Sequence, residues 1–387
     1  MATRGAVLAR QEPRSDAARH PPRVWVLADD RPGNTTQSIG LAETLGWPYE
    51  LKRLQCRWPS RLHNRLLGAH RLGIDARRSS PLEPPWPDLV IAAGRRTAPV
   101  ALWIRKRAGG DTKIVMLGRK GADDARRFDL AVTPSYCRLL PHPRRVEIAA
   151  PLHRVSEALL AEARRGWQER LGAARRPRIA LLVGGTSGQY RLGAAVARRL
   201  AADVVRMSQS CGGSVFVTTS RRLGAAATHA LCSGMQEVAH LHRWTPRATE
   251  NPYLGYLALA DAFVITGDSE SMLSEACSLG KPVYVYPLPV RRSFRILSTP
   301  RDAVWRRAVS GRGALARICS ALIERGWVRP ARDLDRFHAA LQACGAARRF
   351  AGVYDPAHAA APLHDRDAVA ARVRALWPHG AGAALPL

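Results

Sequence analysis

The chain has 387 residues, 46% of them hydrophobic, which is enough for two or three domains with buried cores. Its net charge of +29 favours anionic partners, but the arginines that carry it are spread over the whole chain and only 6% of residues are aromatic, which argues against a nucleic-acid-binding protein. The seven cysteines have no CxxC spacing, which argues against a disulfide framework or a zinc site and favours free thiols in a reducing compartment.

Residues 1–22 are rich in Arg, Ala and Pro and contain no continuous apolar segment of the kind that a signal peptide needs. We expect a disordered tail; a transit peptide is the alternative, against which Glu12 and Asp16 count. No apolar run approaches the ~20 residues of a membrane-spanning helix. We therefore expect a cytoplasmic protein, with peripheral attachment to the inner membrane left open.

The first half of the chain alternates short apolar runs with helical stretches, which are expected at Thr35–Leu45 and Thr97–Arg107. This alternation is typical of a mostly parallel sheet with helices on both faces. The apolar runs expected to form its strands are Val24–Ala28, Leu89–Ala93, Ile114–Leu117, Leu130–Val132 and Val146–Ala149.

A second series of the same kind follows the Arg- and Ala-rich stretch Ala161–Pro177, which has only weak strand signals. Its expected strands are Ile179–Val183, Val215–Thr218, Val238–Leu241, Phe263–Ile265 and Val283–Tyr286. The remaining pattern is helical, over Ala314–Arg325, Asp333–Arg348 and Asp365–Leu376.

These patterns predict an α/β protein of two Rossmann-like domains whose mostly parallel sheets face a cleft. We expect the first domain over residues 23–150 and the second over 178–313, joined within 150–177. The helices over 314–387 are expected to pack partly back on the first domain.

A strand–helix–strand unit around residue 270 carries the most informative polar residues. The strand ends at Thr266, and Asp268, Ser269 and Ser271 follow where the next helix begins. Open parallel sheets bind ligands at the carboxyl ends of their strands. Glu275, on the polar side of this helix, would suit two hydrogen bonds to a ribose diol. The alternative is a carboxylate placed favourably near a helix N-terminus.

A glycine-rich loop follows the strand at Ile179–Val183 and is expected to lead into a long helix that reaches about Val205. Glycines allow close approach of a ligand, and free N–H groups at a helix N-terminus bind anions. We therefore expect a phosphate site; a tight turn is the alternative. Residues after the strand at Val215–Thr218 would suit further phosphate contacts, and a pair of surface arginines is the alternative in a chain so rich in arginine. The residues concerned are Gly184, Gly185, Thr186 and Ser187 in the loop, with Ser220 and Arg221 after the later strand.

Polar residues also follow the first strand of the chain, at the equivalent position of the first sheet. They would suit a hydroxyl-rich substrate, with Asp29 or Asp30 as the base that deprotonates an acceptor hydroxyl. A capped turn is the alternative. Adjacent carboxylates in a strand point to opposite faces, so this pair does not suggest a metal site. The residues are Asp29, Asp30, Gly33, Asn34 and Gln37.

Residues 57–72 combine arginines with Leu62 and Leu66, which would share one face of a helix. An amphipathic basic helix of this kind suits an anionic membrane surface. A helix that covers the sheet is the alternative.

Taken together, these motifs resemble the bacterial branch of the mitochondrial-fission Elm family. The second half also resembles the donor domain of the bacterial peptidoglycan N-acetylglucosaminyltransferase, a GT-B enzyme, at Gly184–Ser187 and Glu275. The chain departs from the Elm pattern at Gly118-Arg119-Lys120, where a proline is expected near the arginine. The segments that match the Elm family are Asp29–Gln37 with Gly40–Ala42, Phe128–Leu130 with Pro134, Gly184-Gly185, Thr219–Arg222, Asn251–Tyr253, Thr266–Met272, Ser274–Ala276 and Gly280–Val283.

The resemblance implies a GT-B-like fold and an inverting, metal-independent glycosyltransferase without a cofactor. Its substrates would be a nucleotide-diphosphate sugar and an envelope or lipid-linked acceptor. The plant members are partners in organelle fission, so the alternative is a non-catalytic protein that recruits a partner to a membrane surface. The donor would contact Gly184, Gly185, Thr186, Ser187, Ser220, Arg221, Asp268, Ser269, Ser271 and Glu275, and the cleft of the first domain would present Gly33, Asn34 and Gln37.

Overall fold

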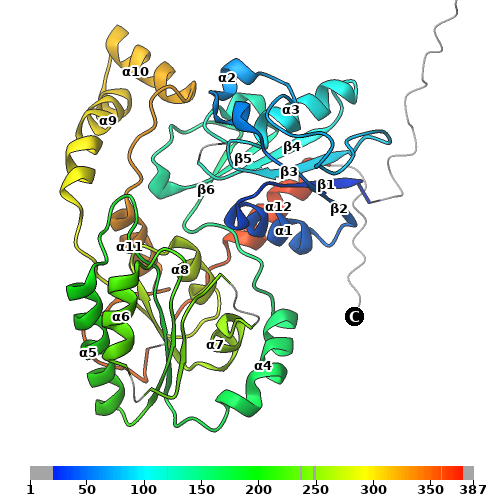
Figure 1. The fold of residues 1–387 in the computed structure, drawn as a ribbon. Helices are drawn as coiled ribbons and strands as arrows, with labels where there is room; N and C mark the ends of the chain where they lie inside the picture. Colours follow the sequence, from blue (N-terminus) through cyan, green and yellow to red (C-terminus); the bar gives the residue numbers. More distant parts are fainter. Residues whose placement is uncertain (1–20, 120, 236–237, 247–249, 359, 378–387) are drawn as a thin grey trace, which may run out of the picture.

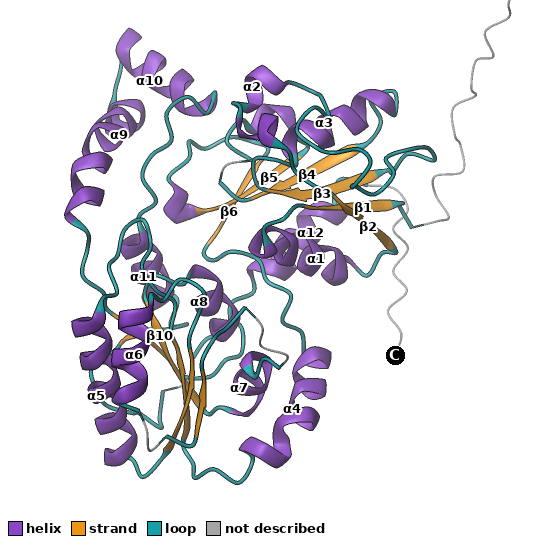
Figure 2. Ribbon diagram, in the orientation of Figure 1, coloured by secondary structure: helices purple, strands orange, loops and turns teal. Residues whose placement is uncertain are grey.

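The computed structural model describes residues 21–119, 121–235, 238–246, 250–358 and 360–377. Apart from its last two residues, the tail expected over 1–22 lies outside this part of the chain. The described residues form two separate six-stranded parallel sheets, each with helices on both faces (Figure 2). The predicted α/β, GT-B-like fold with two Rossmann-like sheets is therefore confirmed.

The first sheet has the strand order β2-β1-β3-β4-β5-β6, and every pair in it is parallel. Its strands are short apolar runs buried on both faces, as parallel sheets require. On one face, α1 (Pro32–Leu45) and α12 (Asp365–Arg374) pack over the sheet; on the other lies α3 (Ala98–Arg107). The strands are β1 (Val24–Ala28), β2 (Tyr49–Arg53), β3 (Leu89–Ala93), β4 (Lys113–Leu117), β5 (Leu130–Pro134) and β6 (Arg145–Ile148).

The second sheet has the order β12-β11-β10-β7-β8-β9 and is also parallel throughout. Its strands are β7 (Arg178–Leu182), β8 (Ser214–Thr218), β9 (His240–His242), β10 (Ala262–Thr266), β11 (Val283–Tyr286) and β12 (Arg348–Arg349). The helices that follow them are α5 (Ala194–Ser210), α6 (Ala225–Ser233), α7 (Tyr253–Leu259) and α8 (Glu270–Cys277).

Each sheet has a switch point, at which the order of the strands along the chain reverses from one side of a central strand to the other. From β1 the chain goes to β2 on one side and then to β3 on the other; from β7 it goes to β8 and β9, and then to β10 on the opposite side. Ligands of such sheets bind outside the carboxyl ends of the two strands at this switch point. The topology therefore predicts ligand binding at the loops after β1 and β3 and at the loops after β7 and β10.

The remaining helices connect the two sheets. After β6, α4 (Glu157–Leu171) packs on α7 in the second half. α9 (Arg292–Ser310) and α10 (Ala314–Glu324) then form a pair along one side of the molecule and reach the first half (Figure 1). α11 (Leu334–Ala343) lies at the second sheet, whereas α12 packs on α1.

Three sequence-based expectations differ from the structure. Residues 57–72 form no continuous helix but a 3-10 turn at Trp58–Arg61 and a short α2 at Asn64–Leu67, because Leu62 adopts an extended conformation between them. The helix expected over Asp333–Arg348 ends at Ala343, because Gly345 turns the chain with φ +72° before β12 begins.

The third difference concerns the glycine-rich loop. The helix expected directly after the glycine-rich loop, which ends at Gly188, begins only at Ala194, so residues 189–193 separate the loop from the helix N-terminus. A helix dipole and the loop therefore do not converge on one phosphate position as expected.

Candidate active site between the two sheets

The turn after β1 is built around the carboxylate of Asp29. Its oxygens accept hydrogen bonds from the Arg31 backbone N–H at 3.1 Å and from the side-chain amide of Asn34 at 3.1 and 3.3 Å. Asn34 in turn lies against Gly94, the residue after β3, where φ is +84° and a Cβ would overlap the Asn34 amide. Loops of β1 and β3 thus meet at the first switch point.

The two predicted catalytic carboxylates have different surroundings. Asp29 is half-buried, and burial raises its pKa, although the hydrogen bonds from Arg31 and Asn34 oppose this. Asp30 is about half exposed and forms an ion pair with Arg96. Asp29 is therefore the less exposed of the two carboxylates and the one without an ion-pair partner in this turn, which makes it the candidate base.

A cavity of about 370 Å³ lies next to this turn, between the two halves of the molecule. It is lined by the predicted cleft residues Asn34 and Gln37, together with residues from the loops after β3 and β4 and from α8. Gly33, Asp29 and Asp30 are not among the lining residues. The predicted residues of the first half thus divide into two that face the cavity and three behind or beside it.

At the second switch point, Asp268 holds the glycine-rich loop in place. Its fully buried carboxylate accepts hydrogen bonds from the Gly185 backbone N–H at 2.9 Å and from the Thr266 hydroxyl at 2.8 Å, and pairs with Arg222 at 2.9 Å. Burial raises the pKa of Asp268, while the Arg222 charge opposes the shift. Asp268 thus connects the loops that follow β7, β8 and β10.

Two glycines of this loop, Gly184 and Gly185, are required by the packing of the protein itself. A Cβ on Gly184 would overlap the Asp268 carboxylate, and one on Gly185 would overlap the Arg222 backbone. Their N–H groups donate to the Thr266 hydroxyl and the Asp268 carboxylate, respectively. Neither N–H group is therefore available to a phosphate without displacing an internal bond.

The other predicted donor residues surround this network. The Ser220 hydroxyl donates to the Gly184 carbonyl, and the Ser187 hydroxyl accepts from the Tyr190 backbone N–H at 3.1 Å. Ser269 is buried. Thr186, Arg221 and Ser271 are exposed and remain accessible to a ligand.

Glu275 is held from α7. The phenol of Tyr253, the first residue of that helix, donates a hydrogen bond to its Oε2 atom. Burial raises the pKa of Glu275 to about 7, and the Tyr253 hydrogen bond opposes that shift. The carboxylate that sequence reasoning assigns to a ribose therefore has a protein partner in this structure.

The structure also brings together residues that sequence reasoning did not select. The Glu270 carboxylate, at the start of α8, accepts a 2.8 Å hydrogen bond from the Tyr136 phenol of the first half and pairs with Arg332. Arg119, from the loop after β4, and Arg332 line both the cavity described above and a second one of about 370 Å³ beside α9. The Elm-like segments that include Pro134 and Glu270, and the departure at Gly118-Arg119, pointed to this region without assigning a role to these residues.

No group of three or more His, Cys, Asp or Glu side chains in the described part of the chain is arranged to hold a metal ion. Likewise, none of the helices that the structure describes is long and apolar enough to span a bilayer.

Comparison with known proteins places these features in a family. Residues 32–333 match the family described as Mitochondrial fission ELM1. The chain is 30% identical over 225 residues to the mitochondrial fission protein ELM1 of Arabidopsis thaliana, a match that spans 52% of each chain and thus about half of that relative. It is 25% identical over 299 residues to the uncharacterized protein RP120 of Rickettsia prowazekii, covering 69% of this chain and 83% of the other.

Among solved structures, the chain is similar to Acinetobacter baumannii MurG, with a TM-score of 0.40 and 15% identity over 92% of this chain and 100% of the other. It is also similar to Arabidopsis thaliana UGT89C1 in complex with UDP-L-rhamnose, with a TM-score of 0.40 and 12% identity over 80% of this chain and 92% of the other.

Proposed function

The chain belongs to the mitochondrial fission ELM1 family, and we propose that it is a glycosyltransferase that moves a sugar from a nucleotide-diphosphate donor to an acceptor hydroxyl. The observation that carries the proposal is the pairing of two switch points, at β1/β3 and at β7/β10, with cavities between the two halves. A donor on one sheet and an acceptor on the other could then meet at that boundary.

In this proposal the donor lies on the second half. Thr186, Arg221 and Ser271 are exposed beside the loop network that Asp268 fixes, and they would supply donors to the diphosphate. Gly184, Gly185, Ser187, Ser220 and Ser269 would shape the loops, and Glu275 would exchange its bond to Tyr253 for a ribose diol. Developing charge on the leaving diphosphate would be stabilised by the exposed Arg221 and by the hydroxyl groups of Thr186 and Ser271, without a metal ion.

Asp29 would act as the base on the acceptor side. Burial raises its pKa, which favours proton acceptance, and Asn34, its hydrogen-bond partner, lines the cavity. Asp30 is less suited because Arg96 already neutralises it.

The test is a thermal-shift screen with uridine and guanosine diphosphate sugars, followed by an assay for release of the nucleoside diphosphate. A donor present at a hundred times its dissociation constant should raise the apparent stability by about 2.7 kcal/mol. The variant Asp29→Asn should keep that shift and lose transfer. Absence of a shift with every sugar and with both free nucleoside diphosphates would contradict the proposal.

A second candidate function is favoured by one surface of the first half. Trp58, Leu62, Leu66 and Leu72 are 70%, 41%, 70% and 58% exposed, in a segment that also carries arginines. Exposed apolar side chains among basic residues suit an anionic lipid surface. A non-catalytic protein that recruits a partner to the cytoplasmic face of the inner membrane would use this surface and would need no donor site.

A further inference from the structure

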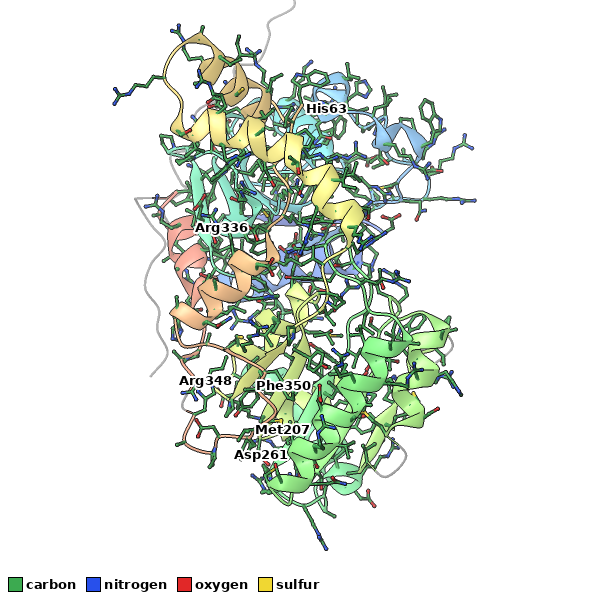
Figure 3. All side chains as sticks on the ribbon, turned by 90° about the vertical axis from the view of Figure 1, so that its left-hand side faces the viewer. His63, Met207, Asp261, Arg336, Arg348 and Phe350 are labelled. Atoms are coloured by element: carbon green, nitrogen blue, oxygen red, sulfur yellow. The ribbon has the colours of Figure 1, made fainter. Side chains whose placement is uncertain are left out.

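The second cavity between the halves, beside α9, is lined by four arginines. Arg119 comes from the loop after β4, Arg291 precedes α9, Arg301 lies within it and Arg332 precedes α11. The cavity has a volume of about 370 Å³, within the range of small-molecule sites. Figure 3 looks onto this side of the molecule, with α9 crossing in front and the labelled Arg336 of α11 below it.

The positive charge in this cavity is not balanced by the protein. Arg332 pairs with Glu270, but Arg119, Arg291 and Arg301 have no carboxylate partner among the residues that the structure describes. The Arg119 guanidinium is held in place because it donates to the Pro330 carbonyl, while its buried Nε atom has no hydrogen-bond partner. Arg291, which donates to the Ser187 carbonyl at 3.2 Å, and Arg301 are exposed at the edge of the cavity.

The environment of Arg119 indicates how much an anion would gain. Burial lowers its pKa to about 10, and the charges of Arg332, Arg329 and Arg301 act in the same direction. An oxyanion among these groups would relieve both the desolvation and the repulsion. Guanidinium groups suit phosphate oxygens because each offers two N–H donors in one plane.

One wall of the cavity is apolar. Phe294 and Leu297 of α9 line it, and Leu297 is 61% exposed; the neighbouring Ile296 is 73% exposed. A ligand that combines an oxyanion with a hydrocarbon chain would cover these side chains, whereas a free inorganic anion would leave them in water.

We propose that this cavity, which borders the loop after β7 at Gly188 and Gln189, is an oxyanion site that binds a diphosphate group carried on an apolar chain. Its assignment to the acceptor rests on the proposed glycosyl transfer, whereas the binding itself does not. Because Arg119 and Arg332 also line the cavity beside Asn34 and Gln37, a group attached to the diphosphate would extend toward Asp29.

The test uses calorimetry of the full chain with farnesyl diphosphate, inorganic pyrophosphate, farnesol and uridine diphosphate. The variant Arg291→Gln/Arg301→Gln changes two exposed arginines of the cavity. The matched control, Arg306→Gln/Arg307→Gln, removes the same charge from exposed positions of α9 that do not line the cavity.

We expect farnesyl diphosphate to bind more tightly than pyrophosphate, and farnesol not to compete with it. The cavity variant should bind both diphosphates about tenfold or more weakly than the parent, because the loss of one charged hydrogen bond lowers affinity by about that factor. The control variant should bind them with the affinity of the parent. Equal affinity in parent and cavity variant would overturn the proposal.

Two further outcomes also overturn it. One is that uridine diphosphate binds the parent more tightly than farnesyl diphosphate does and that the cavity variant binds uridine diphosphate more weakly. The cavity would then be part of the nucleotide site. If farnesol displaces farnesyl diphosphate, the apolar wall alone binds. The proposed glycosyl transfer is tested separately, because donor sugars should stabilise the cavity variant as they stabilise the parent.

Discussion

Tyr253 donates its phenolic hydrogen to the Oε2 atom of Glu275, and this bond joins α7 to α8 beneath the second switch point. Glu275 is thus a half-buried acid whose desolvation raises its pKa to about 7, with one hydrogen bond from the protein. A ribose diol would have to join or replace the phenol. The pair therefore offers a direct test of where the donor binds.

We predict that Glu275→Ala weakens the binding of a nucleotide sugar by about 1–3 kcal/mol, the usual consequence of leaving polar groups without partners. Tyr253→Phe, which removes only the competing hydroxyl, should bind the donor at least as tightly as the parent. Isothermal calorimetry on folded protein measures both. Unchanged affinity in Glu275→Ala would remove the ribose role.

We also predict a pH dependence of stability from Glu275. Its pKa is higher in the folded state, about 7, than its ordinary value of 4.5, so the native state binds more protons between these values. The contribution to the free energy of unfolding is then fully present below pH 4.5 and is lost as pH rises through about 7. Because each unit of difference in pKa corresponds to about 1.36 kcal/mol, the loss is at most about 3.4 kcal/mol.

Denaturant unfolding of the parent and of Glu275→Gln between pH 4.5 and 8 measures this contribution. The difference between the two proteins should change with pH, with the parent losing stability relative to the variant as pH rises. If the free energies of unfolding of the two proteins change in parallel with pH, Glu275 does not titrate in this range.

The glycine-rich loop provides a prediction about packing. Gly185→Ala should destabilise the fold by about 1–3 kcal/mol, because the added methyl group overlaps the Arg222 backbone and the loop is already fixed by Asp268. Gly188→Ala is the matched control, since nothing lies within 4 Å of a Cβ at that position. If thermal denaturation shows the same loss of stability for both variants, the overlap with the Arg222 backbone is not the cause of the destabilisation.

The sequence was sufficient for elements with strong local patterns. Val24–Ala28 and Leu89–Ala93 are continuous apolar runs, and both are strands at the expected positions. β2, Tyr49–Arg53, was missed because charged residues alternate through an edge strand. α9 was missed because arginines and an internal proline, Pro300, mask its helical pattern.

The residues of the candidate site likewise fall into those that a local sequence pattern predicts and those that only the tertiary structure brings together. Asp29 and Asn34 are close in sequence, so a local motif was enough to suggest them. Arg119 and Arg332 come together only through the tertiary fold, and in a chain with 60 Lys and Arg residues no local feature separates them from surface arginines. The bond between Tyr253 and Glu275 likewise depends on how α7 packs beside α8.

A buried ion pair fixes the segment between α10 and α11 to the first half. Arg329 donates to Oδ2 of Asp123 from Nε at 2.8 Å and from Nη2 at 2.6 Å, and the side chains are 21% and 8% exposed. Trp327, two residues earlier, stacks on His63 with ring centroids 4.4 Å apart. Together they hold the α9–α10 pair beside the cleft.

We therefore predict that Asp123→Asn lowers the free energy of unfolding by about 3 kcal/mol, since removing one partner leaves a partly buried charge without compensation. Glu250→Gln is the control: its pair with Arg170 is exposed on both sides, so no measurable change is expected. Chemical denaturation compares the two. A similar effect of both substitutions would show that the Asp123 pair contributes no more than a surface contact.

The last prediction concerns attachment to lipid. Leu62 and Leu66 are exposed in the basic segment of the first half. Leu66 lies in the short α2 and Leu62 in the extended link before it, instead of on the continuous helix that the sequence suggested. If this surface inserts into a membrane, Leu62→Gln/Leu66→Gln should reduce co-sedimentation with anionic vesicles several-fold, because apolar insertion and charge act together. Binding by the parent should weaken as salt rises, since ionic screening acts over about 8 Å at physiological strength.

Val353→Gln, at a 66% exposed apolar position of the second half, is the control and should bind vesicles like the parent. Donor binding should be the same in all three proteins. Equal sedimentation of parent and double variant would exclude this segment as the membrane contact and would remove the specific support for a recruitment function.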